Sequence, residues 1–194
     1  DYARLVSAAE AQTHAGRVVG GAGVWFPEGA WVSPPSLCAA WLDAHAGRIE
    51  TRFACAVSVA DLVALRAEGA LVVDASGAGL VATLPVARVR GQVTRLPADA
   101  ARRLDIAITG DGYIAPMPGG GHCAGASFGH DDLDLAPRAT EHAENLARVE
   151  RMLPTFTAGL DAASLDGRAG LRITTPDRVP AFGLLTEGHA VATG

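Results

Sequence analysis

Apolar residues alternate with polar or small ones over much of the chain, and a period of two is typical of β-strands. This pattern predicts strands at 53–59, 71–75, 86–96, 105–109, 112–116, 122–128, 168–173 and 179–185. Residues 24–26 and 29–32 read as the two arms of a hairpin, since Pro27 and Gly29 between them favour a turn.

Three segments have the spacing of helices. Ser7 with Glu10 three residues later forms a capping-box pattern for a helix over 7–15, and prolines after Ser33 start a second over 33–45. The third covers 140–153, with Thr140 as its cap, an apolar face, and Pro154 ending it. Strands therefore dominate, with two or three flanking helices. The expected fold is α+β in a single domain, built on a mainly antiparallel sheet.

Composition narrows the class of protein. The 194 residues carry a formal charge of −5, which argues against a chain that coats nucleic acid through bulk electrostatics. Five arginines nevertheless fall close together at Arg88, Arg90, Arg95, Arg102 and Arg103. We expect a solvated face with acidic neighbours, and a small RNA contact patch is the alternative.

Nothing in the sequence indicates a metal site or a membrane span. Cys38, Cys55 and Cys123 are far apart and have no zinc-ligand spacing, so we expect reduced thiols and a cytoplasmic location. His122 and His130 are expected on the surface or in loops. No apolar run reaches spanning length and no signal peptide is recognisable, so no membrane and no metal are expected. The first residue is Asp1 rather than methionine, which suggests a piece of a longer protein.

Two segments carry candidate chemistry. In 110–128 two short strands place Tyr113 opposite glycine, alanine and serine, which leaves room for a ligand beside its phenol. In 170–183 Arg172 lies between Leu171 and Ile173, so a half-buried guanidinium in need of an anionic partner is expected there. That partner is either Asp177, in an internal salt bridge, or the carboxylate of a substrate.

Residues 77–82 match the dinucleotide pattern GxGxxG/A, but their context argues against it. A phosphate-binding loop must open a helix, whereas Pro85 and a strand follow here. We interpret the segment as a strand-to-loop transition. Among the tryptophans, Trp41 is expected in the core, and the roles of Trp25 and Trp31 stay open.

The order of four segments resembles the D-amino-acid-oxidase-like flavoproteins. They are 86–93, 111–116, 122–128 and 172–183, and 19–37 is also similar. Within that superfamily the chain is most similar to the C-terminal oxidoreductase domain of the MnmC family, bifunctional enzymes that make 5-methylaminomethyl-2-thiouridine in tRNA. The resemblance extends from about Ser7 to Gly183.

The resemblance implies FAD as cofactor, tRNA as partner and a methyltransferase domain in the full-length protein. It implies that the carboxymethyl group of 5-carboxymethylaminomethyl-uridine at the wobble position is removed by oxidation and released as glyoxylate. Tyr113 and Arg172 would hold the substrate carboxylate. The positions bordering FAD would be Ala75, Gly77, Gly79, Arg178, Pro180 and Gly183.

The same resemblance implies a division of the chain. Residues 20–70 and 86–170 would form the substrate-binding part, and 71–85 and 171–194 the strands bordering the FAD domain. The family's N-terminal GxGxxG strand and helix and its closing segment are absent, so we expect the chain alone to bind FAD poorly and to be inactive. Two alternatives stay open: an FAD-dependent oxidase of glycine or another small amine, and a non-enzymatic ligand-binding module.

Overall fold

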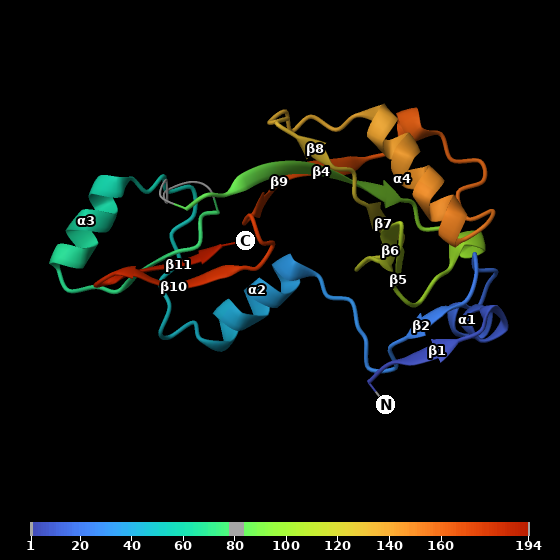
Figure 1. The fold of residues 1–194 in the computed structure, drawn as a ribbon, viewed down its shortest axis with the longest axis horizontal. Coiled ribbons are helices and arrows are strands. Elements are labelled where there is room, and N and C mark those ends of the chain that lie inside the picture. The colour runs from blue at the N-terminus through green and yellow to red at the C-terminus, as the bar shows by residue number, and fades with distance from the viewer. Residues whose placement is uncertain (1, 78–83, 194) are drawn as a thin grey trace. The chain divides into compact units, whose positions relative to one another are not determined.

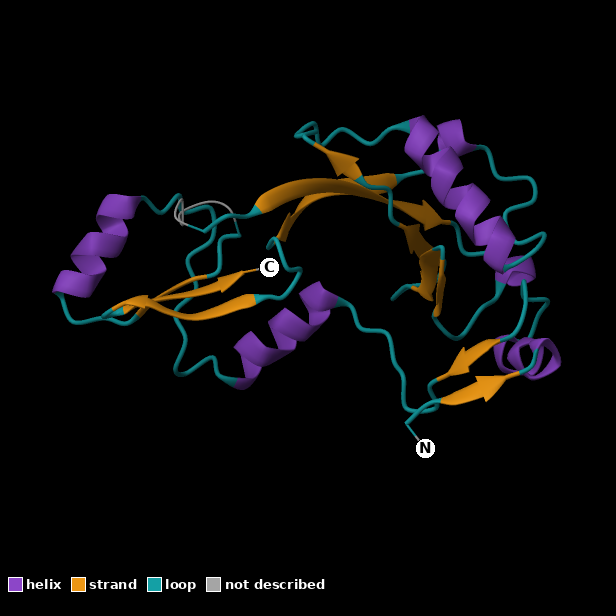
Figure 2. Ribbon diagram, in the orientation of Figure 1, coloured by secondary structure: helices purple, strands orange, loops and turns teal. Residues whose placement is uncertain are grey.

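The computed structural model describes residues 2–77 and 84–193, which form two compact units. The first unit comprises 1–47, 91–128 and 135–170, and the second comprises 48–90, 129–134 and 171–194. Both units mix helices and strands (Figures 1 and 2). The helices of the described chain are α1 (Ala8–Ala15), α2 (Pro34–Ala44), α3 (Val59–Ala67) and α4 (Ala139–Met152), with short 3-10 turns at Ala100–Arg102 and Ala162–Ser164. The strands are β1 (Arg4–Val6), β2 (Gly23–Trp25), β3 (Val72–Asp74), β4 (Ala87–Leu96), β5 (Ile108–Gly110), β6 (Gly112–Pro116), β7 (His122–Gly125), β8 (Gly129–His130), β9 (Gly167–Thr174), β10 (Ala181–Thr186) and β11 (His189–Thr193).

The largest sheet has six strands. Its order is β5-β6-β7-β4-β8, and β9 also pairs with β4. β4 pairs antiparallel with β7 and β8, β5 with β6, and β6 with β7. The predicted α+β class with a mainly antiparallel sheet is confirmed, with four α-helices among the described residues rather than two or three.

Helix α4 covers one face of this sheet and creates the main core (Figure 1). The apolar residues of the helix recur about every 3.6 positions and so lie on one side of it. They pack on every second residue of the strands, because alternate strand residues point to the same face of the sheet. The buried cluster is Ala15, Leu96, Leu104, Ile114, Ala124, Leu146, Val149, Leu153 and Phe156. The predicted cap is wrong, because α4 begins at Ala139 and its N-cap is Arg138, which puts Thr140 inside the first turn.

Polar side chains also lie between β4 and α4, and all of them are paired. The side chain of Asn145 donates to the carbonyl of Gln92 at 3.0 Å and to the hydroxyl of Thr94 at 3.1 Å. That hydroxyl lies 2.8 Å from Nδ1 of His142. Because buried polar groups are costly when unpaired, these bonds fix the register of the helix on the strand.

The predicted hairpin at 24–32 is wrong, although its turn exists. Gly29 donates to the carbonyl of Phe26 at 3.0 Å, but residues 30–32 form no strand. β2 pairs instead with β1, antiparallel, with Trp25 opposite Arg4. The helix between them is confirmed with its capping box, in which Ser7 and Glu10 bond reciprocally.

The second unit contains a three-stranded sheet, β10-β11-β3, in which β11 pairs antiparallel with β10 and parallel with β3. The strand predicted at 53–59 is wrong, since the segment leads into α3. A capping box of Ser58 and Asp61 starts this helix, and two reciprocal bonds outweigh a short β-like pattern. Trp41, expected in the core, is 61% exposed on α2.

None of the helices in the described part of the chain combines the length and the apolar character needed to cross a bilayer. Within 2–77 and 84–193, no three His, Cys, Asp or Glu side chains gather as metal ligands would.

Candidate functional site

Tyr113 lies on the face of the large sheet that is turned away from α4. Its neighbour Ile114 is fully buried in the core under α4, and successive strand residues point to opposite faces. In register, Tyr113 faces Gly125 on β7 and Thr109 on β5. The predicted arrangement of one tyrosine opposite a small residue is therefore present in the first unit.

Glycines next to Tyr113 in the strand and across from it are required by close packing. A Cβ at Gly112 would come within 2.8 Å of the carbonyl oxygen of Gly125, and one at Gly125 within 3.0 Å of Cγ1 of Val93. Gly112 also has φ +99°, which side chains rarely adopt. Glycine is thus fixed by sterics beside Tyr113, whatever ligand that face binds.

The Tyr113 hydroxyl lies 3.9 Å from the thiol of Cys123. Burial raises the pKa of the Cys123 thiol, and the contact with Tyr113 and the charges of Arg95 and Arg168 oppose that shift only in part. The thiol is therefore protonated near neutral pH and does not act as a nucleophile. The adjacent His122 points into the core, where its Nε2 lies 3.2 Å from the carbonyl of Leu104, so its expected surface position is wrong.

Arg172 lies on β9, and its side chain is exposed, so the expected half-buried guanidinium is not found in the described chain. The period of two puts it on the same side of β9 as Gly170 and Arg168. The charge of Arg168 acts on the Cys123 thiol, which lies next to Tyr113. The N-terminal end of β9 is therefore near the face that carries Tyr113. Arg172 itself belongs to the second unit and Tyr113 to the first, so the clamp between them stays a prediction.

The residues expected to border FAD lie in the second unit. Ala75 and Gly77 follow the end of β3, and Gly183 lies on β10 opposite Val191. Arg178 lies in the turn after β9, where its amide donates to the carbonyl of Thr175 at 3.0 Å. Pro180 follows this turn. Gly79 lies outside the described residues.

Two features at this edge fit a large polar cofactor, and Gly77 is not one of them. Gly77 has φ +76°, and a Cβ there would lie 3.0 Å from Cγ1 of Ile173, so the chain itself fills the space beside it. Gly183 has φ +151° and open space where its side chain would be. Asp74, at the end of β3, is 5% exposed, and its Oδ2 is buried without a hydrogen-bond partner among the described residues. An unpaired buried acceptor is costly unless a ligand donates to it.

Sequence reasoning missed Asp74. Its signal is an acid in the apolar run 71–75, directly before the glycines. The Oδ1 atom accepts from the amide and the hydroxyl of Ser76, at 2.9 and 2.6 Å, and this bond pattern turns the chain at the strand end. Only the second oxygen remains for another donor.

Three of the five clustered arginines have acidic neighbours. Arg95 pairs with Asp166 at 2.9 Å, Arg103 with Asp105 at 3.1 Å, and Arg102 with Asp99. Arg102 also donates to the carbonyl of Phe156 at 3.0 Å, which connects its loop to the core.

The family model described as FAD dependent oxidoreductase matches residues 1–194. The chain is 40% identical over 197 residues to the tRNA 5-methylaminomethyl-2-thiouridine biosynthesis bifunctional protein MnmC of Azoarcus sp. (strain BH72), covering 94% of this chain and 31% of that protein. The protein of the same name from Paraburkholderia xenovorans (strain LB400) is 38% identical, over 99% of this chain and 32% of its own length. The chain thus spans about a third of the length of these curated relatives.

Solved structures agree on the fold. Glycine oxidase from Geobacillus kaustophilus superposes with a TM-score of 0.74 at 23% identity, covering 99% of this chain and 57% of that one. L-proline dehydrogenase from P. horikoshii gives a TM-score of 0.65 at 15% identity, covering 99% and 59%. Because the family model matches residues 1–194, the chain belongs to the family of FAD-dependent oxidoreductases.

Proposed function

We propose that the chain is the substrate-binding part, with some cofactor-bordering strands, of an oxidoreductase that acts on a modified uridine in tRNA. The substrate is 5-carboxymethylaminomethyl-uridine or its 2-thio form at the wobble position, and the carboxymethyl group leaves as glyoxylate. The observation that carries the proposal is the identity of 40% over 94% of this chain to a protein named for tRNA 5-methylaminomethyl-2-thiouridine biosynthesis. Membership of an FAD-dependent family also favours an enzyme over a non-enzymatic binding module.

In this proposal Arg172 and Tyr113 bind the substrate carboxylate. A planar guanidinium offers two parallel donors to a carboxylate, and a phenol adds a third. Fixing the carboxylate at one end orients the methylene between it and the amine, which is the carbon that is oxidised.

When bound, FAD would supply the two-electron acceptor for the hydride that leaves this methylene. The substrate amine then forms a C=N bond to the same carbon, and water adds across it. The C–N bond breaks, the amine stays on the uridine as an aminomethyl group, and the two-carbon fragment departs as glyoxylate. Substrate binding and orientation are the task of this chain, so no acid–base pair is required of it.

The cofactor would lie against the end of β3 and against β10. Gly183, beside which the space is open, would allow the cofactor to approach the backbone closely. Oδ2 of Asp74 would accept a hydrogen bond from one of its hydroxyl groups. Arg178 and Pro180 would border it from the turn after β9.

The test uses the whole protein in which these residues occur, with tRNA that carries the carboxymethylaminomethyl group. Glyoxylate release and the loss of the group, followed by mass spectrometry of the nucleosides, are expected together. Tyr113→Phe and Arg172→Lys should raise KM for the tRNA, because each weakens the hold on the carboxylate. Arg52→Lys is the matched control, since Arg52 is exposed and pairs with Glu50 at 2.8 Å away from these residues.

The alternatives give other results. A small-amine oxidase would turn over free glycine readily and leave the tRNA unchanged. A protein that shows no flavin absorbance after purification with added FAD would contradict any oxidase role.

A further inference from the structure

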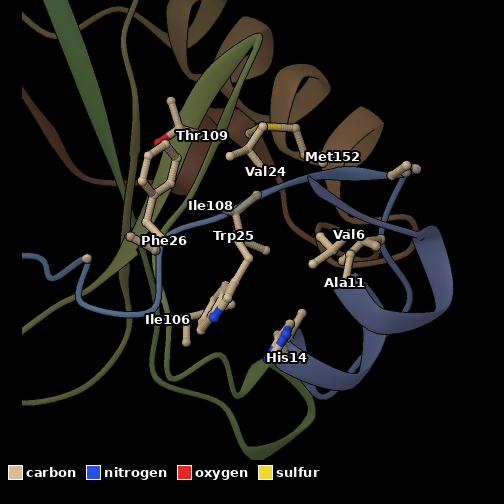
Figure 3. Close-up of a pocket in the computed structure, with 18 of the residues that line it drawn as sticks. Val6, Ala11, His14, Val24, Trp25, Phe26, Ile106, Ile108, Thr109 and Met152 are labelled. Carbon is tan, nitrogen blue, oxygen red and sulfur yellow. The ribbon is translucent and has the colours of Figure 1, made fainter. Parts of the chain in front are cut away.

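The first unit contains a cavity of about 780 Å³ that the proposed chemistry does not use. It lies between the β1–α1–β2 segment and β5, with Met152 of α4 behind it. Its floor is aliphatic, from Val6, Val24, Ile106 and Ile108, as Figure 3 shows. Ligand pockets of comparable size, ~300–1,000 Å³, hold small organic molecules.

Aromatic rings form the walls of this pocket. The imidazole of His14 and the indole of Trp25 lie parallel, with centroids 4.1 Å apart and an interplanar angle of 1° (Figure 3). Phe26 is 44% and Trp31 39% exposed, although both line the cavity. Half-exposed rings around a cavity favour a flat ligand, because ring faces left in water gain from stacking.

Two charged residues also line the cavity, Arg151 and Asp105. The side chain of Arg151 is 58% exposed and pairs with Asp111. At the ring stack, Nη2 of Arg4 lies 3.0 Å from Nε2 of His14. The cavity therefore carries no surplus of positive charge, and its aromatic and aliphatic lining is what suits a flat nucleobase.

The cavity adjoins the face proposed to bind substrate. Thr109 lines it, and Thr109 is also the cross-strand partner of Tyr113. Side chains paired across antiparallel strands lie ~5 Å apart on one face. A nucleotide next to the oxidised uridine would reach the cavity from there.

We propose that this pocket binds a nucleobase of single-stranded RNA, adjacent to the nucleotide that is oxidised. The choice of RNA as the ligand rests on the proposed function. The pocket would add a second contact with the RNA, independent of the binding of the carboxylate by Arg172 and Tyr113. Aromatic side chains are the usual platforms for unpaired bases, because every base has a face on which to stack.

The experiment measures binding of an unmodified anticodon stem-loop RNA to the whole flavoprotein. Trp31→Ala and Phe26→Ala should each weaken binding about 5- to 100-fold, the loss expected for one base stack. Trp41→Ala is the matched control, because Trp41 is 61% exposed on α2 and does not line the cavity. Flavin absorbance and the melting temperature report whether each variant folds.

A second measurement holds even if a variant misfolds. Of the three tryptophans in this chain, Trp25 and Trp31 line the cavity and Trp41 does not. Adenosine 5′-monophosphate and uridine 5′-monophosphate should therefore quench the emission of the whole protein saturably, and Trp31→Phe should reduce this quenching whereas Trp41→Phe should not. Binding of free mononucleotides would support a base pocket even if the tRNA proved not to be oxidised, so the two proposals fail separately.

Two results would overturn the inference. One is stem-loop binding by folded Trp31→Ala and Phe26→Ala proteins with the affinity of the unaltered protein. The other is the absence of saturable quenching by either mononucleotide, which would mean that an apolar protein segment fills the cavity. Glyoxylate release from tRNA under either result would leave the proposed function standing.

Discussion

Gly167, the first residue of β9, is a position where a single methyl group should destabilise the first unit. A Cβ there would overlap the carbonyl oxygen of Val93 and lie 2.5 Å from Cε1 of His142. The carbonyl belongs to β4, and the imidazole is held by its 2.8 Å contact with Thr94, so neither moves alone. Gly167→Ala therefore forces β9 and β4 apart or breaks the buried bond.

The magnitude follows from these two contacts. Overpacking a tight interior costs about 1–3 kcal/mol, and loss of the Thr94–His142 bond costs about 1 kcal/mol. Alanine also reduces the conformational entropy of the unfolded chain, which raises the free energy of unfolding by roughly 0.4–1 kcal/mol. Gly167→Ala should thus lower the free energy of unfolding by about 1–3 kcal/mol.

Gly170→Ala on the same strand is the control, because a Cβ there would meet nothing within 4 Å. Only the stabilisation that comes from restricting the unfolded chain applies to Gly170→Ala, so the two variants should differ in free energy of unfolding by about 1.4–4 kcal/mol. In a chain of this length that difference separates their melting temperatures by roughly 3–16 °C. The assay is thermal unfolding followed by circular dichroism. Equal melting temperatures for the two variants would refute the steric reasoning.

Three further results are expected. Burial lowers the pKa of His142, so below pH 6.5 the unfolded chain binds more protons than the folded one. The free energy of unfolding should therefore fall as the pH falls. Urea titrations from about pH 8 to about pH 5 measure this, and His142→Gln should weaken the pH dependence. Burial raises the pKa of the Cys123 thiol, so iodoacetamide near neutral pH should label the exposed Cys38 first, as peptide mapping would show, and equal rates would contradict the buried environment. Asp74→Ala should weaken FAD binding to the whole protein about tenfold in a flavin-fluorescence titration, since a charged acceptor is lost, whereas unchanged affinity would make Asp74 purely structural.

The local part of the fold was readable from the sequence. Ser7 and Glu10 start α1 as predicted, and the alternation over 112–116 and 122–125 gives β6 and β7. These elements are set by bonds or side-chain periods within a few residues. The position of Tyr113 opposite a glycine followed from the same short-range pattern, because two neighbouring strands and one turn fix it.

Failures arose where the partner lies far along the chain or the signals compete. β2 pairs with β1 some twenty residues earlier instead of with 29–32, and no local residue encodes that choice. At 53–59 the β-like pattern gave way to the capping box of Ser58 and Asp61. Such outcomes depend on the free energy of the whole arrangement, which a window of sequence does not contain.

The sequence by itself determined the antiparallel α+β architecture, the helices with strong caps, the glycine-walled tyrosine and the family resemblance. Only the tertiary structure decided that Asp74 has a buried oxygen without a partner and that Arg172 is exposed. It alone brought Trp25 and His14 into a stack around a cavity beside Thr109. The reason is physical: alternation and capping act between near neighbours, whereas burial, cavities and ring stacking depend on which distant segments pack together.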